Sequence, residues 1–310
     1  MFAAAAAASI FGAGRIQQTR AWDFPPALRD PFPGFFSGVS IPAAALQSDL
    51  IAKLFATRKS PADLEVSGDV AGVPRGETRY LARGDLLAMS QALTVSPDDG
   101  NFKTEMEVKA VPLDDLARSL GAPPDDMIVA ICNDGYRGHY PRAYRAAHHP
   151  VLVTELNGKA LEQSQDDEGP YLIAHVYFKP AFRILAHSDE PQIPWGVIRL
   201  DFRNEKTVLS AIAPGGPHGG DPLVQDGYKI ARQNCLRCHY NGDEGGLKSR
   251  VSWAILSALA ANSPEFFAQY VRDPKSKNPK TQMAASPEYD DATMRALVAY
   301  FRTFAPKGAN

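Results

Sequence analysis

The sequence predicts an α+β protein in which a mixed α/β region precedes a smaller, all-α region. Up to residue 212, short apolar runs that end in turn signals alternate with short helical patterns. From residue 222 onward only helical patterns recur, and the intervening residues 213–221 are rich in glycine and proline, which is typical of a linker. At 310 residues the chain also exceeds the usual size of a single core.

The composition is that of an ordinary globular protein, with 45% hydrophobic and 22% charged residues. A net charge of −2 leaves no basic footprint, so we expect no nucleic-acid partner. The chain has three cysteines, and two of them share one short motif, so no disulfide framework is available.

Residues 1–60 are expected to form no regular domain. Residues 1–14 are small and apolar like the centre of a signal peptide, but they lack its positively charged start, so they indicate a signal remnant or a tail. The following segment is rich in proline and aromatic residues and is predicted to be irregular, with a short helix at Ala44–Phe55.

Residues 61–212 are predicted to form the mixed region. A short helix opens at Arg83, and a second covers Pro112–Leu120, where leucines share one face and Gly121 ends the helix. The predicted strands, most of them bounded by turn residues, are Ala92–Val95, Met106–Ala110, Met127–Ile131, Val151–Leu156, Tyr171–Phe178 and Val197–Phe202.

Histidines and arginines gather after the strand Met127–Ile131. They could bind an anion, but charged loops are usually exposed, so we predict a solvated basic surface. A further histidine, His175, alternates on a strand and is predicted to be a packed or surface side chain rather than a ligand. The gathered residues are Arg137, His139, Arg142, Arg145, His148 and His149.

The most specific motif is Cys235-Leu236-Arg237-Cys238-His239, because Cys-x-x-Cys-His is the attachment sequence for c-type haem. On one helical turn, positions i and i+3 share a face, so both thiols can reach one edge of the same macrocycle. A thioredoxin-like redox pair would need a surrounding βαβ pattern, and a zinc site would need a second ligand pair. We therefore predict one covalent haem on Cys235 and Cys238, with His239 as an iron ligand.

A low-spin haem iron needs a second axial ligand, and a methionine thioether raises the reduction potential. Met283 is the candidate, because it lies in a proline-bounded loop without helical periodicity. Met294 instead shares a helical face with Leu297 and Phe301, which indicates a core residue. Trp253 and Tyr240 are candidates for the wall of a haem pocket or for hydrogen bonds to the propionates.

Residues 222–310 resemble a small monohaem cytochrome c of the His/Met type. The helix Leu223–Asn234 runs into Cys235, a helix begins at Pro264 and ends before Asp273, and the last helix runs from Asp290 or Asp291 to Phe304. The resemblance implies that the first and last of these helices cross, with Gly227 against Tyr300 or a close neighbour. Because bacterial haem attachment occurs outside the cytoplasmic membrane, we expect a periplasmic or otherwise exported protein.

Residues 60–205 resemble the molybdopterin-binding domain of the sulfite oxidase family, in which a cysteine thiolate holds molybdenum. Cys132 lies at or near the matching place, but Asn133-Asp134-Gly135-Tyr136 departs from the sequence of the metal-binding members. The departure favours a domain without molybdopterin. The stretches that carry the resemblance are Gly84–Leu87, Val111–Leu113, Asp134–Tyr136, Asn157-Gly158, Glu168–Pro170 and Pro194–Val197.

Together these features predict an electron-transfer protein rather than an enzyme. One alternative is a molybdenum-dependent dehydrogenase with Cys132 on the metal and the haem as electron exit. Another is a cytochrome subunit of a larger respiratory or photosynthetic membrane complex. A redox partner could dock on a basic run that precedes Met283, where charge raises the encounter rate, or the run could be a solvated loop. That run consists of Arg272, Lys275, Lys277 and Lys280.

Overall fold

The computed structural model describes residues 52–161, 169–178, 186–214 and 216–305. Every described residue belongs to one compact unit, Asp49–Asn310. The predicted signal remnant and most of the helix expected at Ala44–Phe55 lie outside the described residues. The end of that helix prediction is wrong, because Leu54–Phe55 is a strand that pairs with a neighbouring strand.

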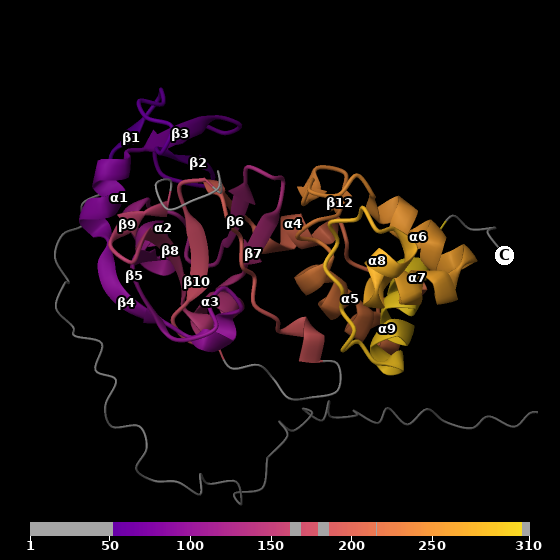
Figure 1. Ribbon diagram of the computed structural model, residues 1–310. Helices are drawn as coiled ribbons and strands as arrows, with labels where there is room; N and C mark the ends of the chain where they lie inside the picture. Colours follow the sequence, from indigo (N-terminus) through magenta and orange to yellow (C-terminus); the bar gives the residue numbers. More distant parts are fainter. Residues whose placement is uncertain (1–51, 162–168, 179–185, 215, 306–310) are drawn as a thin grey trace, which may run out of the picture. The chain divides into compact units, whose positions relative to one another are not determined.

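Two sheets make up most of residues 52–214, here called the sheet region (Figure 1). The larger sheet has the strand order β1-β3-β2-β11-β6-β7, and its neighbours are antiparallel except for the parallel pair β2 and β11. Its strands are β1 (Leu54–Phe55), β2 (Leu64–Gly68), β3 (Thr78–Leu81), β6 (Met127–Cys132), β7 (Arg137–Tyr140) and β11 (Val197–Arg203).

The second sheet is antiparallel throughout, with the order β10-β8-β5-β4 and β9 added to β8. All six strand predictions are met by a strand, but β10 is shorter than expected at Tyr171–Phe178. It ends at His175, which pairs with Pro150, the first residue of β8. The strands are β4 (Gln91–Val95), β5 (Met106–Pro112), β8 (Pro150–Leu156), β9 (Lys159–Ala160) and β10 (Leu172–His175).

Short helices complete the sheet region. The predicted helices at Arg83 and Pro112 are confirmed, and Gly121 takes a φ of +67° just beyond the second one. Their buried leucines follow the predicted face, since Leu113 and Leu116 are both fully buried. The helices are α1 (Arg83–Met89), α2 (Leu113–Ser119), α3 (Arg142–His148) and α4 (Glu205–Ser210), with 3-10 turns η1 (Pro97–Asp99) and η3 (Ala186–Ser188). A further 3-10 turn, η4 (Gly216–His218), follows the sheet region.

Residues 216–305, here called the helical region, contain five α-helices and one very small hairpin among the described residues. The predicted helices before the haem motif, at Pro264 and at the C-terminus are confirmed. The region is not all-α, because β12 pairs with β13 directly after the motif. The elements are α5 (Pro222–Asn234), β12 (Tyr240–Asn241), β13 (Glu244–Gly245), α6 (Trp253–Asn262), α7 (Pro264–Arg272), α8 (Pro274–Lys277) and α9 (Asp291–Arg302).

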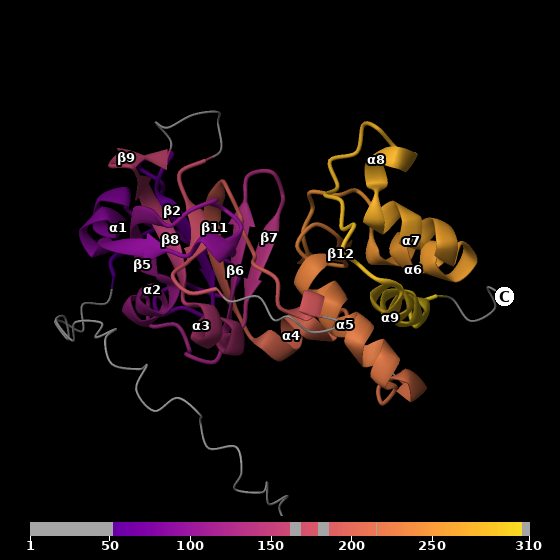
Figure 2. The same cartoon turned by 60° about the horizontal axis from the view of Figure 1, so that its bottom comes forward.

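Helices α5 and α9 cross in close contact, as Figures 1 and 2 both show. A Cβ atom built on Gly227 would lie 2.0 Å from the Ala296 carbonyl oxygen and 2.7 Å from the Tyr300 Cβ. Only glycine therefore permits this separation of the two backbones. The predicted meeting of Gly227 with Tyr300 is confirmed.

Strand β6 carries two hydrophobic cores, one on each face. Ile128 and Ala130 belong to a core inside the sheet region, whereas Met127 and Val129 belong to a core that includes Leu297 and Phe301 of α9. Successive residues of a strand point to opposite faces, so one strand serves both cores. The predicted boundaries at 61–212, 213–221 and 222–310 remain predictions, while packing continues from β6 into the helical region.

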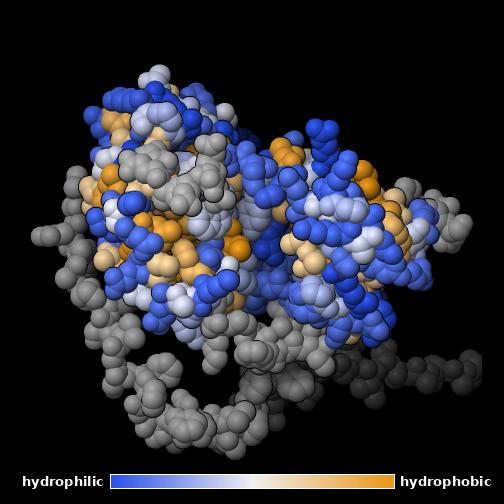
Figure 3. All heavy atoms as spheres, viewed as in Figure 1, coloured by the Kyte–Doolittle hydropathy of each residue, from blue (hydrophilic) through white to orange (hydrophobic). Residues whose placement is uncertain are grey.

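No helix within the described residues is long and apolar enough to cross a membrane. In Figure 3 hydrophilic residues predominate over α5, α8 and α9, with apolar residues scattered among them.

Candidate haem site

The haem motif forms one further turn at the end of α5. Cys235 is the C-terminal cap of the helix, and the N–H groups of Cys238 and His239 both donate to its carbonyl oxygen, at 3.1 and 2.9 Å. Both thiols are free and half-buried. The predicted arrangement of two thiols and an imidazole on one turn is therefore present in the backbone.

His239 has the protonation pattern of a metal ligand. Its Nδ1 lies 2.7 Å from the Val251 carbonyl oxygen, and a carbonyl can only accept, so Nδ1 carries the proton. Nε2 is then an acceptor, and it has no hydrogen-bond partner among the described residues. Burial lowers the pKa of His239, which keeps the ring neutral and its Nε2 lone pair available to iron.

The hairpin after the motif closes on the motif's own backbone. A Cβ on Gly245 would lie 2.2 Å from the His239 carbonyl oxygen, and one on Gly246 would lie 2.0 Å from that of Arg237. The N–H of Gly246 donates to Leu236 at 2.8 Å. These glycines let the chain turn back against the motif and fix the position of the ligand turn.

The two motif thiols are neutral before attachment. Burial raises the pKa of Cys235 to about 12 and also raises the pKa of Cys238, although the Arg237 guanidinium opposes both shifts. The donor set consists of two thiols on one turn and a neutral imidazole with an unpartnered nitrogen. It fits a covalently attached haem.

Met283 lies in the loop where the sequence places it. The side chain is half-buried and lines a cavity of about 420 Å³. Its N–H donates to the Thr281 hydroxyl at 3.2 Å, and Tyr270 donates to the same hydroxyl at 3.3 Å. Met283 as the second axial ligand stays a prediction, whereas Met294 is buried in the helical core as expected.

Trp253 is part of a buried aromatic core. Its indole N–H donates to the Tyr300 hydroxyl at 3.2 Å, and that hydroxyl donates to the Ile212 carbonyl at 2.5 Å. The indole N–H is therefore engaged and is not free for a propionate. Tyr240 stands half-buried in β12.

Arg237 anchors the motif to the segment that precedes β11. Its guanidinium donates to the Asn234 carbonyl at 3.2 Å and to the Pro191 carbonyl at 3.2 Å, and it approaches the Tyr136 hydroxyl at 3.4 Å. The backbone N–H of Arg137 on β7 donates to the Arg237 carbonyl at 2.9 Å. Sequence reasoning missed this role, because a position between the two cysteines is free to vary in the motif itself.

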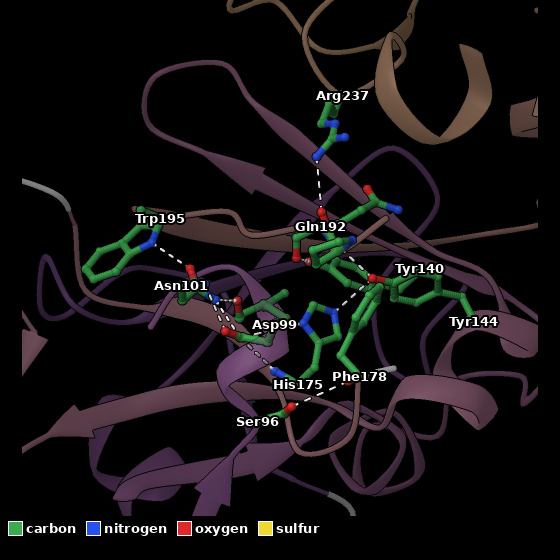
Figure 4. Close-up of polar contacts among 12 residues, drawn as sticks. Ser96, Asp99, Asn101, Tyr140, Tyr144, His175, Phe178, Gln192, Trp195 and Arg237 are labelled. Atoms are coloured by element: carbon green, nitrogen blue, oxygen red, sulfur yellow. Dashed lines mark hydrogen bonds and ion pairs between the residues drawn. The ribbon is translucent and has the colours of Figure 1, made fainter. Parts of the chain in front are cut away.

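A buried polar network lies behind this anchor (Figure 4). His175 Nε2 lies 3.0 Å from the Tyr144 hydroxyl, which accepts the N–H of Gln192 at 3.1 Å. The carbonyl of the same peptide group, that of Pro191, accepts a hydrogen bond from the Arg237 guanidinium. On the other side, Asp99 accepts the backbone N–H of His175 at 3.2 Å.

The solvated basic surface expected for the histidine and arginine segment is wrong for half of its members. Arg145 is buried because carbonyls of Asp126, Tyr140 and Pro124 accept from its guanidinium, and Asp114 pairs with it at 2.6 Å. His148 is buried and contacts Asp189 at 2.7 Å. His139 is also buried, whereas Arg142 remains exposed.

His139 is the unusual member of this segment. Both of its ring nitrogens are buried and have no hydrogen-bond partner among the described residues. Burial, with Arg137 nearby, lowers the pKa of His139 to about 3, so the ring is neutral.

Cys132 ends β6 and faces the core inside the sheet region, with 3% of its surface exposed. Burial raises the pKa of its thiol well above the ordinary value, so the thiolate that binds metals is disfavoured. Cys132 therefore has the properties of a packed core thiol, and the absence of molybdopterin stays a prediction.

The basic run before Met283 is mostly exposed. Lys275, Lys277 and Lys280 all face solvent. Arg272 already donates to the Tyr289 carbonyl and to Asp291, each at 2.7 Å. The three lysines therefore carry the positive charge of the run that has no ion-pair partner within the described part of the chain.

Comparison with known proteins agrees with this geometry for part of the chain. No curated protein matches the chain. The family model described as "Cytochrome c" matches residues 224–305, which include both motif cysteines, His239 and Met283. The chain therefore carries a cytochrome c domain over these residues, and it is an electron-transfer haem protein.

Proposed function

We propose that this protein carries single electrons through one haem bound covalently to Cys235 and Cys238, with His239 Nε2 and Met283 as axial ligands. The hydrogen bond from His239 Nδ1 to Val251 carries the proposal, because it leaves Nε2 unprotonated in a buried turn. The haem, when bound, supplies the change between ferric and ferrous iron.

The chain's own contribution is to position and enclose the site. Val251 holds the imidazole orientation, Gly245 and Gly246 close the hairpin on the ligand turn, and Arg237 ties that turn to the sheet region. Hydrogen bonds to the atoms of a metal-binding side chain that face away from the metal commonly set its basicity and orientation. Restricted solvent access and a thioether ligand both favour the ferrous state and a high potential.

Haem attachment is the decisive test. We would express the full chain in a bacterium that exports it and attaches haem, and then extract the purified protein with acidic acetone. The wild type is expected to retain one haem per chain. The double variant, with both Cys235→Ala and Cys238→Ala, is expected to release its haem. Cys132→Ala is the matched control and should retain its haem. A wild type without covalent haem would refute the proposal.

We further propose that the sheet region serves as a scaffold or partner-docking module, without molybdopterin. Its support is the burial of Cys132 and the shared core on β6. Elemental analysis of the holoprotein tests this role: iron without molybdenum is expected, and stoichiometric molybdenum that disappears in Cys132→Ala would establish the dehydrogenase alternative.

We also propose an exported, periplasmic protein, and size-exclusion chromatography of a native extract tests whether it belongs to a larger complex.

The redox partner is proposed to dock beside Met283, on Lys275, Lys277 and Lys280. The proposal is supported by the exposure of these three lysines, none of which forms an ion pair with a described residue. Reversing all three charges to glutamate should slow oxidation of the ferrous protein by ferricyanide, an anion, and weaken its dependence on salt. Lys206→Glu on α4 is the matched control. Equal rates in the triple variant and the control would contradict this docking face.

A further inference from the structure

Three metal-binding side chains meet near the haem motif without belonging to it. His187 and Glu190 lie in and just after η3, and Glu288 lies in the loop before α9. One ligand atom from each lies within 4.8 Å of the others, and no other such group occurs among the described residues. We propose that this cluster binds one divalent transition-metal cation, with zinc as the best match.

The donor types fit that cation. One imidazole nitrogen and two carboxylate oxygens form the protein part of a common zinc coordination sphere, which leaves a fourth position for water. Calcium and magnesium prefer all-oxygen sites, so the imidazole selects against them. The His187 Nδ1 and Glu190 Oε1 atoms are 2.7 Å apart, so a cation would replace the shared proton between them.

The cluster is held in place by groups that do not use its ligand atoms. Gln233 donates to the Glu190 carbonyl and Asn234 donates to the His187 carbonyl, each at 2.5 Å. Both donors are the last residues of α5, so the cluster is fixed to the turn that carries Cys235. The site therefore requires little ordering when a cation binds.

The surrounding side chains orient two of the ligands. The ring of Tyr289 lies 4.2 Å from the ring of His187, and Tyr289 is buried, which anchors the chain next to Glu288. Arg237 lies 3.7 Å from the second oxygen of Glu190, Oε2. Figure 4 shows Arg237 directed toward the Gln192 segment that follows Glu190. An outer partner on Oε2 sets the direction of Oε1, the oxygen that faces His187.

Glu288 supplies the third ligand atom of the cluster. Its side chain is exposed and forms no hydrogen bond or ion pair with a described residue. The free carboxylate lies beside His187, which already contacts Glu190 and has the acidic Asp290 nearby. A bound cation would join the segment before β11 to the loop between Met283 and α9, and so would add a further link between the sheet region and the haem site.

Isothermal titration with zinc chloride tests the proposal on the haem-loaded full chain after chelator treatment. One zinc ion per chain is expected, and zinc-edge X-ray absorption should show one imidazole and otherwise oxygen ligands. His187→Ala and Glu288→Gln should each weaken binding about tenfold or more, since losing a ligand costs at least as much as losing an outer partner. His218→Ala and Glu265→Gln replace residues of the same types elsewhere and should bind as the wild type does.

Three outcomes would overturn the site: no saturable zinc binding, binding unchanged in both cluster variants, or an absorption spectrum without an imidazole that His187→Ala removes. Glu288→Gln changes an exposed side chain, so a folded variant is expected and is checked by its unfolding curve. Because the readout is bound zinc, the result is independent of the haem ligands.

Discussion

Replacing Gly227 with alanine sets two physical effects against each other. Alanine is about 1 kcal/mol more favourable than glycine within a helix, so propensity alone predicts stabilisation. The new Cβ, however, would lie 2.0 Å from the Ala296 carbonyl oxygen and 2.6 Å from its carbon. Both obstacles are backbone atoms of α9, so no side chain can rotate away to admit the methyl group.

The size of the loss follows from the required movement. An ordinary contact needs about 3.4 Å, so α5 and α9 would have to separate by more than about 1 Å, and packing around Tyr300 would loosen. Overpacking of this kind costs about 1–3 kcal/mol and sometimes more, and a backbone obstacle favours the upper end. After the propensity gain, we expect Gly227→Ala to lower the free energy of unfolding by about 2 kcal/mol.

Denaturant unfolding followed by haem absorbance and by circular dichroism measures this change, and Gly84→Ala is the matched control. Gly84 is a helical glycine of α1, and nothing lies within 4 Å of the position that an alanine methyl group would take there, so only the propensity gain applies. The two substitutions should therefore shift stability in opposite directions. A Gly227→Ala protein as stable as the wild type would refute the close crossing of α5 and α9.

Three further predictions concern single side chains. Burial lowers the folded pKa of His139 to about 3, so below pH 6.5 the unfolded chain binds a proton that the folded chain does not. Between pH 6.5 and 4.5, urea unfolding should therefore show the free energy of unfolding falling by about 2 kcal/mol more in the wild type than in His139→Gln. Equal losses in the two proteins would contradict a buried neutral ring. Met283→Ala should abolish the far-red sulfur-to-iron absorption band and lower the reduction potential, whereas Met294→Ala should keep the band and lower the free energy of unfolding by about 2–5 kcal/mol. If Met283→Ala keeps the band, Met283 is not the iron ligand. Arg237→Lys should keep the haem attached but lower the free energy of unfolding by about 1.5–3 kcal/mol, because an ammonium cannot reproduce the forked bonds to Asn234 and Pro191, and unchanged stability would show that these bonds contribute nothing.

Much of the secondary structure follows from local patterns in the sequence. The helix before Cys235 and the helix at Asp291 have polar caps and apolar periodicity, and both are confirmed within two residues. Helix α6 was missed because it is apolar on nearly every side and shows no periodic face. Strand β7 was missed because Arg137-Gly138-His139-Tyr140 has neither alternation nor β-branched residues.

Part of the haem site could likewise be predicted from the sequence, and part of it depends on the fold. The motif cysteines, His239 and Met283 could be predicted as haem-binding residues because that chemistry depends on residue type and spacing. The Val251 carbonyl could not be foreseen, since every residue has such a group and only the fold selects one. Burial of Arg145 was likewise hidden, because its partners include three backbone carbonyls that leave no trace in side-chain patterns.

The turn after Cys132 shows why a departure from a family sequence needs a structural explanation. Gly135 has a φ of +86°, its carbonyl accepts the Leu247 N–H at 2.7 Å, and a Cβ there would lie 2.9 Å from the Leu247 carbonyl carbon. Asp134 adds an ion pair with Lys248. The same residues that depart from the metal-binding pattern thus form the contact with the chain that follows the haem motif. A glycine is required there by the close approach of another backbone. The turn after Cys132 is therefore an attachment between the sheet region and the chain that follows the haem motif, and this role requires no chemistry of the buried Cys132.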